Sequence, residues 1–82
     1  AVRPAPASAD VYLLLGLALD HLGRYDDAAE AYRVVARMSE APYRPLLLLG
    51  RALTRSGDIA QAVEVFDAAR ALKPQPVTTA AR

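Results

Sequence analysis

Side chains that could carry out acid-base or metal chemistry are few in this sequence and scattered. His21 is the only histidine, and there is no cysteine. Asp20 precedes His21, but adjacent positions on a helix diverge by about 100°, so the two side chains point to different sides. Asp26 and Asp27 are also adjacent, and negative charge in the first turn of a helix accounts for both. The sequence predicts no catalytic residue, no metal site and no cofactor, and therefore no enzyme.

Ligands that need a strong charge or a long apolar segment are not expected either. Ten Lys and Arg residues against nine Asp and Glu residues give a net charge of +1, whereas nucleic-acid binding needs a basic stripe. The four glycines are spread along the chain and form no phosphate-binding loop, and no small-molecule substrate is predicted. The longest apolar run, residues 11–19, is shorter than the roughly 20 residues that span a bilayer.

The composition is that of a globular protein, with 54% apolar and 23% charged residues. Nine of the ten cationic residues are Arg, which together with the alanine content suggests a bacterial genome rich in G and C. Without cysteines the compartment stays open between cytoplasm and periplasm, with a slight preference for the cytoplasm. Because the chain begins with Ala1, we expect it to be part of a larger protein.

Apolar periodicity and capping residues predict four helices, between an Ala/Pro linker over residues 1–8 and a frayed tail over residues 77–82. The helices are expected over residues 9–22, 25–38, 43–56 and 59–72. Ser8 can cap the first helix, and Gly23 and Gly57 can end the first and third. Asp58 and Gln61 have the spacing of a capping box for the fourth helix, and Pro74 and Pro76 are expected to stop it.

The first predicted helix is apolar on nearly all sides. Its inward stripe is predicted to contain Tyr12, Leu15, Gly16, Leu19 and Leu22, and that of the fourth helix Ile59, Ala62, Val63 and Phe66. Leu13, Leu14 and Leu17 lie off the first stripe. A helix of this kind must be covered on both sides or bind something.

The chain resembles itself after a shift of 34 residues, which superposes Leu13 to Gly16 on Leu47 to Gly50. This spacing resembles the tetratricopeptide repeat, with its pattern W-x2-L-G-x2-Y, A-x3-F and P. The first unit, residues 9–42, offers Tyr12-x2-Leu15-Gly16-x2-Leu19 and Ala28-x3-Tyr32, with Glu40 in place of proline. The second, residues 43–76, offers Leu46-x2-Leu49-Gly50-x2-Leu53, Ala62-x3-Phe66 and Pro74.

The small residues of this pattern have a mechanical role, because they lie where the two helices of a unit press closest together. They are Gly16 and Ala28 in the first unit and Gly50 and Ala62 in the second. The resemblance implies an all-α fold of four helices, in which two antiparallel hairpins stack as a short right-handed α-solenoid.

The resemblance also implies a protein-protein interaction scaffold, in which the first helix of each unit lines a groove for a peptide or helix of a partner. The groove residues selected are Leu13, Leu17, His21, Arg44, Leu47, Leu48, Arg51 and Arg55; Asp10, Leu14, Asp20 and Thr54 match further groove positions. A subclass that grips chaperone C-termini carries Lys and Asn where this chain has Leu13, Leu17 and Leu48, so that clamp is not expected. The hypothesis is a partner segment with apolar anchors flanked by Asp or Glu.

Several of these residues also have a purely structural interpretation. Leu14 and Leu48 suit packing between units, whereas Leu13, Leu17 and Leu47 suit the groove. Arginines on such a helix also suit a solvated face.

The alternative function is self-association, as a homodimer or as an interior part of a longer solenoid. Two units are fewer than the roughly three that such arrays usually need, and no polar capping helix follows Leu72. An apolar face left open at the end of the fourth helix should be covered by further repeats, a second copy or a partner.

Overall fold

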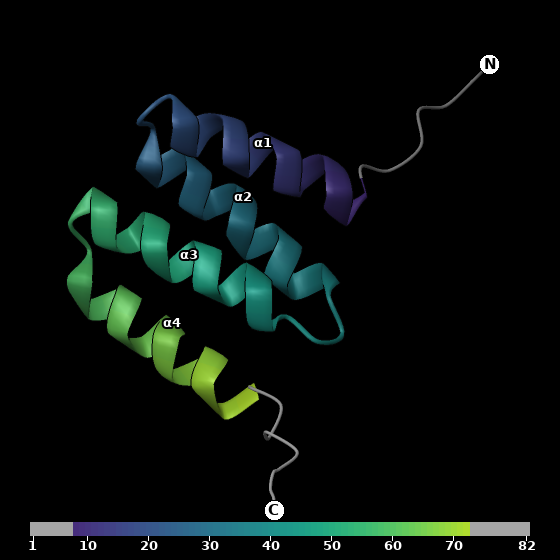
Figure 1. The fold of residues 1–82 in the computed structure, drawn as a ribbon, viewed down its shortest axis with the longest axis vertical. Coiled ribbons are helices and arrows are strands. Elements are labelled where there is room, and N and C mark those ends of the chain that lie inside the picture. The colour runs from purple at the N-terminus through teal and green to yellow at the C-terminus, as the bar shows by residue number, and fades with distance from the viewer. Residues whose placement is uncertain (1–7, 73–82) are drawn as a thin grey trace, which may run out of the picture.

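A computed structural model of the chain describes residues 8–72. Its elements are α1 (Ala9–His21), α2 (Tyr25–Met38), α3 (Tyr43–Ser56) and α4 (Ile59–Leu72). Each helix runs antiparallel to the one before it and packs against it, so that α1 and α4 lie at the two ends of the row (Figure 1). The expected all-α fold of two stacked hairpins is therefore confirmed. The predicted linker, the stop at Pro74 and Pro76 and the frayed tail fall on residues 1–7 and 73–82, outside the described residues.

Local capping fixes where the helices begin and end. The Ser8 side chain accepts a hydrogen bond from the Val11 amide at 3.4 Å, so Ser8 is the N-cap of α1, as predicted. Gly23 and Gly57 adopt φ values of +82° and +97°, the left-handed conformation that ends a helix most readily at glycine. The first helix ends one residue earlier than expected, with Leu22 as its cap.

Half of the predicted capping box at α4 is present. The Gln61 amide donates to Asp58 Oδ1 at 3.2 Å, which confirms Asp58 as the cap. The predicted return contact from the Gln61 side chain is wrong, because Gln61 Oε1 instead accepts a hydrogen bond from Arg33 Nη2 at 3.0 Å. The hydrogen bond between Arg33 and Gln61 links α2 to α4.

Within each hairpin a glycine lies against an aromatic ring. A Cβ atom added to Gly16 would approach the Tyr32 ring to 2.6 Å, and one added to Gly50 would approach the Phe66 ring to 2.7 Å. Neither glycine could therefore be replaced without moving the ring. The core formed around these contacts is contributed mainly by α2 and α3 and contains Ala28, Ala29, Tyr32, Leu49, Ala52, Leu53 and Ala62.

The predicted inward stripes of the two terminal helices are partly wrong. Leu15 of α1 and its cap residue Leu22 are exposed, and Leu14, for which packing between units was expected, is also exposed. In the stripe predicted for α4, Ile59, Val63 and Phe66 are exposed and Ala62 is buried. The physical reason is that α1 and α4 each have a close helical neighbour on one side only among the described residues, whereas α2 and α3 have neighbours on both.

Candidate protein-binding groove

An apolar groove of about 540 Å³ opens between the first helices of the two hairpins. Its lining residues are Leu13 and Leu17 of α1, Tyr43, Arg44, Pro45, Leu47, Leu48 and Arg51 of α3, and Phe66 of α4. Leu13 and Leu48 also pack against the core cluster, so the floor of the groove is continuous with the core. Leu17 stays largely exposed and is available to a ligand.

Helical spacing brings these side chains to one face. Leu13 and Leu17 are four residues apart on α1, and Leu47 and Arg51 are four residues apart on α3. Residues at this spacing lie one above the other on the same side of a helix. Each helix therefore contributes a row, and the two rows face the same groove.

A second, polar hollow of about 400 Å³ adjoins the groove. It is lined by Leu17, Asp20, His21, Tyr25, Arg51 and Arg55. Leu17 and Arg51 line both spaces, so the groove and the polar hollow form one continuous surface with an apolar part and a charged part.

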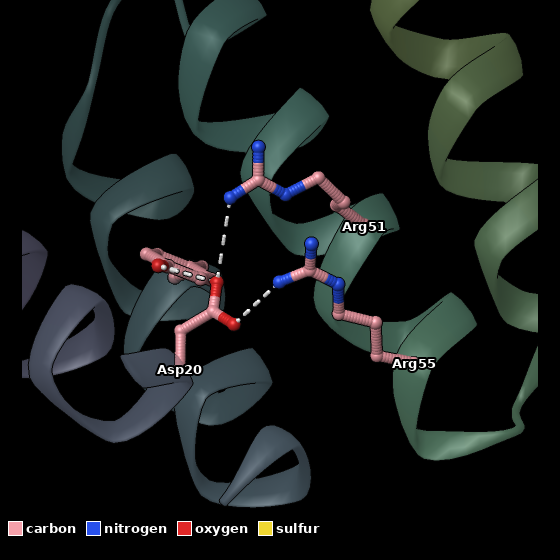
Figure 2. A network of polar contacts seen from close by, with 4 residues as sticks. Asp20, Arg51 and Arg55 are labelled. Carbon is pink, nitrogen blue, oxygen red and sulfur yellow. Dashed lines mark hydrogen bonds and ion pairs between the residues drawn. The ribbon is translucent and has the colours of Figure 1, made fainter. Parts of the chain in front are cut away.

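A buried carboxylate organises the polar hollow (Figure 2). Arg55 Nη1 lies 3.0 Å from Asp20 Oδ1, and Arg51 Nη2 lies 3.7 Å from Asp20 Oδ2. The Tyr32 hydroxyl donates to Asp20 Oδ2 at 3.4 Å from the other side. Asp20 is thus paired as a buried charge must be, and it ties α1 to α2 and α3.

The contacts around Asp20 raise the pKa of Tyr32 and hold Arg55 more firmly than Arg51. Burial, with the carboxylate of Asp20 adding to it, raises the pKa of Tyr32 to about 12. The Arg55 guanidinium also lies over the Tyr25 ring, 5.7 Å from its centroid, a favourable cation-π geometry. Arg55 is therefore held from two sides, whereas Arg51 makes one long contact and leaves more of its hydrogen-bonding capacity free.

Comparison with protein families decides the identity of the fold. A family model described as Tetratricopeptide repeat matches residues 22–81, which include α2, α3 and α4. The chain belongs to the tetratricopeptide repeat family. Comparisons with curated proteins and with solved structures found no match. Tetratricopeptide repeats are a non-catalytic fold that serves as a scaffold for protein-protein interaction.

Within residues 8–72 no helix has the length and apolar character needed to cross a membrane. In the same residues no three His, Cys, Asp or Glu side chains gather where they could hold a metal ion.

The structure places all eight of the groove residues selected from sequence on this surface. The apolar groove contains Leu13, Leu17, Arg44, Leu47, Leu48 and Arg51, and the polar hollow contains Leu17, His21, Arg51 and Arg55. Arg51 and Arg55 are half-exposed but are not a free solvated face, because both face Asp20. Whether these residues bind a partner remains a prediction.

Sequence reasoning missed several lining residues and the role of Asp20. Tyr25, Tyr43, Pro45 and Phe66 line the two spaces without having been selected. A signal for Asp20 was present in the repeat: a carboxylate in the last turn of an apolar helix and a pair of arginines four residues apart on the helix that repeats it. Opposite charges on equivalent helices of neighbouring repeats predict a bridge between them.

Proposed function

We propose that the apolar groove binds a segment of a partner protein, a peptide or a helix, that carries apolar anchors next to an acidic residue. The observation that carries this proposal is the continuity of the two spaces, with leucines in one and arginines at the edge of the other. Leucine side chains supply area that a partner can desolvate, and arginine suits contacts with carboxylates.

The ion pairs of Asp20 indicate which arginines are available to an acidic residue of the partner. Two guanidinium groups face one carboxylate, so a single positive charge is left over at the polar hollow. Arg55 is held by Asp20 and Tyr25, and reversing its charge would disturb the fold itself. Arg51 and Arg44 are exposed and line the groove. A partner carboxylate therefore fits best near Arg51 and Arg44.

The proposal can be tested by titrating the chain with two labelled peptides of equal length. One carries leucines four residues apart with flanking glutamates, and the other carries the same leucines with glutamines. We expect the acidic peptide to bind more tightly and to lose affinity as salt is raised, because salt screens exposed charges. Fluorescence anisotropy at several salt concentrations measures both effects.

Variants assign the binding to the groove. Arg44→Glu with Arg51→Glu should weaken the acidic peptide about tenfold or more, since both charges are reversed. The double variant should have little effect on the glutamine peptide. Arg37→Glu is the matched control, because Arg37 is an exposed arginine on α2 that lines neither space. Equal binding of the acidic peptide by the double variant and the wild type would remove the acidic part of the proposal.

The apolar part needs its own variant. Leu17→Ser truncates an exposed leucine shared by both spaces, so it should weaken both peptides while leaving the helices intact. If neither peptide binds the wild type at any salt concentration, this partner chemistry is wrong.

A further inference from the structure

Two apolar faces at opposite ends of the molecule have no covering helix among the described residues. Their exposed large apolar side chains are Val11, Leu14 and Leu15 on α1, with Leu22 at its C-cap, and Ile59, Val63 and Phe66 on α4. In Figure 1 these helices form the two ends of the row, with α2 and α3 between them. Exposed apolar patches of this kind mark interaction surfaces.

The internal repeat shows what the face of α1 accepts. A shift of 34 residues places Leu15 on Leu49, but Leu15 is 46% exposed and Leu49 is 3% exposed. Ala18 is exposed as well, and its equivalent Ala52 is fully buried. Both α1 and α3 are followed by a packed helix, and of the two only α3 is preceded by one within residues 8–72. The outer face of α1 is therefore the surface that α3 uses to pack on α2.

The face of α4 is the other half of the same contact. The same shift places Val63 on Ala29 and Phe66 on Tyr32. Val63 and Phe66 are 53% and 38% exposed, whereas Ala29 and Tyr32 are 3% and 0% exposed. Both α2 and α4 pack on the helix before them, and in the described part of the chain only α2 is covered by a helix after it. The outer face of α4 is therefore the surface that α2 offers to α3.

We infer that α4 of one copy of the chain receives α1 of a second copy, in the arrangement that α2 and α3 already adopt within one molecule. The two halves of the contact differ and lie at opposite ends of the same chain. Such a head-to-tail contact leaves one free face of each kind on every pair, so assembly continues as the concentration rises.

The junction between copies differs from the junction within the chain in its charge. The shift of 34 residues replaces Asp20 by Thr54, and it replaces Arg51 and Arg55 by Leu17 and His21 of the second copy. The ion pairs of Asp20 therefore have no counterpart between copies. The association should be apolar in character and strengthened by sulfate, whereas binding of an acidic peptide in the groove should be weakened by salt.

Sedimentation velocity over a wide concentration range tests the inference, with two variants that each damage one face. Leu15→Glu alters α1 and Val63→Glu alters α4, and each should weaken self-association at least tenfold. The Leu15→Glu chain keeps an intact α4 face, and the Val63→Glu chain keeps an intact α1 face. A mixture of the two should form a 1:1 complex that does not grow further.

Ala60→Glu is the matched control, since Ala60 is exposed on the same helix as Val63, and its equivalent Asp26 stays exposed where α3 covers α2. It should leave association unchanged. A wild-type chain that stays monomeric at every concentration would overturn the inference, as would a mixture that stays monomeric. Self-association of either variant alone at the wild-type level would overturn it too, because it would show a symmetric contact that needs only one of the two faces. Circular dichroism checks that each variant is helical, and Ala18→Glu, on the same face, replaces Leu15→Glu if that variant is not. These results do not depend on whether a peptide binds the groove.

Discussion

The two hairpins have the same contact between a glycine and an aromatic ring, but they differ in how deeply the ring is buried. In the hairpin of α1 and α2, Gly16 lies against Tyr32, and in the hairpin of α3 and α4, Gly50 lies against Phe66 at nearly the same distance. Yet Tyr32 is fully buried and Phe66 is more than one third exposed. The glycine contact is thus a property of a single hairpin, whereas burial of the ring depends on the helix that follows.

The hairpins differ in polar contacts as well. The Tyr32 hydroxyl reaches Asp20, which in turn receives Arg51 and Arg55 from the next hairpin. The second hairpin has Phe66 in place of Tyr32 and Thr54 in place of Asp20, so it lacks both the phenol hydroxyl and the carboxylate of this network. The junction inside the chain is therefore both apolar and ionic, and the exposed apolar face of α4 has no counterpart of this ionic contact.

Truncating the two aromatic rings should have the largest effect and should show this difference directly. We expect Tyr32→Ala to lower the free energy of unfolding by about 3–5 kcal/mol, a usual cost for a fully buried aromatic residue. That loss is comparable with the whole stability of a small protein. Phe66→Ala removes a ring that is partly exposed, and we expect a loss of about 1–2 kcal/mol. Urea denaturation at low protein concentration, where association is minimal, measures both.

Equal losses in the two variants would show that the neighbouring helix contributes little and would contradict the comparison. At high protein concentration the gap between the two losses should narrow if a second copy covers Phe66 and leaves the burial of Tyr32 unchanged. In that case the stability of the wild type should rise with concentration, and that of Phe66→Ala should rise less.

The second prediction uses alkaline pH to distinguish the two hairpins, because the first has the phenol of Tyr32 where the second has Phe66. The pKa of Tyr32 is raised to about 12 from an unfolded value of 10.0. Above about pH 10 the unfolded chain loses this proton while the folded chain keeps it, so the free energy of unfolding falls as the pH rises toward 12. The contribution is fully present below pH 10, and its loss amounts to about 2–3 kcal/mol.

Tyr32→Phe gives the first hairpin the aromatic residue of the second and removes the titrating group. Denaturation midpoints of the two proteins should therefore differ in their dependence on pH between about 10 and 12. Parallel pH profiles would mean that Tyr32 ionises as easily in the folded chain as in the unfolded one.

Much of the fold could be predicted from the sequence, because local chemistry and the repeat agree. Gly23, Gly57, Ser8 and Asp58 occupy positions where helix ends need them, and the structure has the caps that they predict. The exposure of Leu15 could not be predicted from its periodicity. The apolar residues of a helix show which of its faces is apolar. Whether another helix covers that face does not follow from the spacing of residues within the helix.

The candidate site was predictable to a different extent. Rows of side chains four residues apart placed Leu13, Leu17, Leu47 and Arg51 on one surface, since helical spacing decides this without tertiary information. The pairing of Arg51 with Asp20 depends on how α1 and α3 are offset across the junction. That offset is set by packing around the core and is not contained in either helix alone.

The carboxylate itself gives the smallest and most specific test of the comparison. Asp20→Ala removes the acceptor of both guanidinium groups and of the Tyr32 hydroxyl, and we expect a loss of about 1–2 kcal/mol. A hydrogen bond to a charged group contributes more than this in isolation, but the arginines are half-exposed and regain water as partners. Thr54→Ala, at the equivalent position of the second hairpin, loses a hydroxyl that bonds the Gly50 carbonyl of its own helix, and it should change stability by less than about 0.5 kcal/mol. Raising the salt concentration should narrow the gap between wild type and Asp20→Ala but leave Thr54→Ala where it is. If the two alanine variants lose equal stability at every salt concentration, the ion pairs do not stabilise the junction between the hairpins, and apolar contacts alone hold it together.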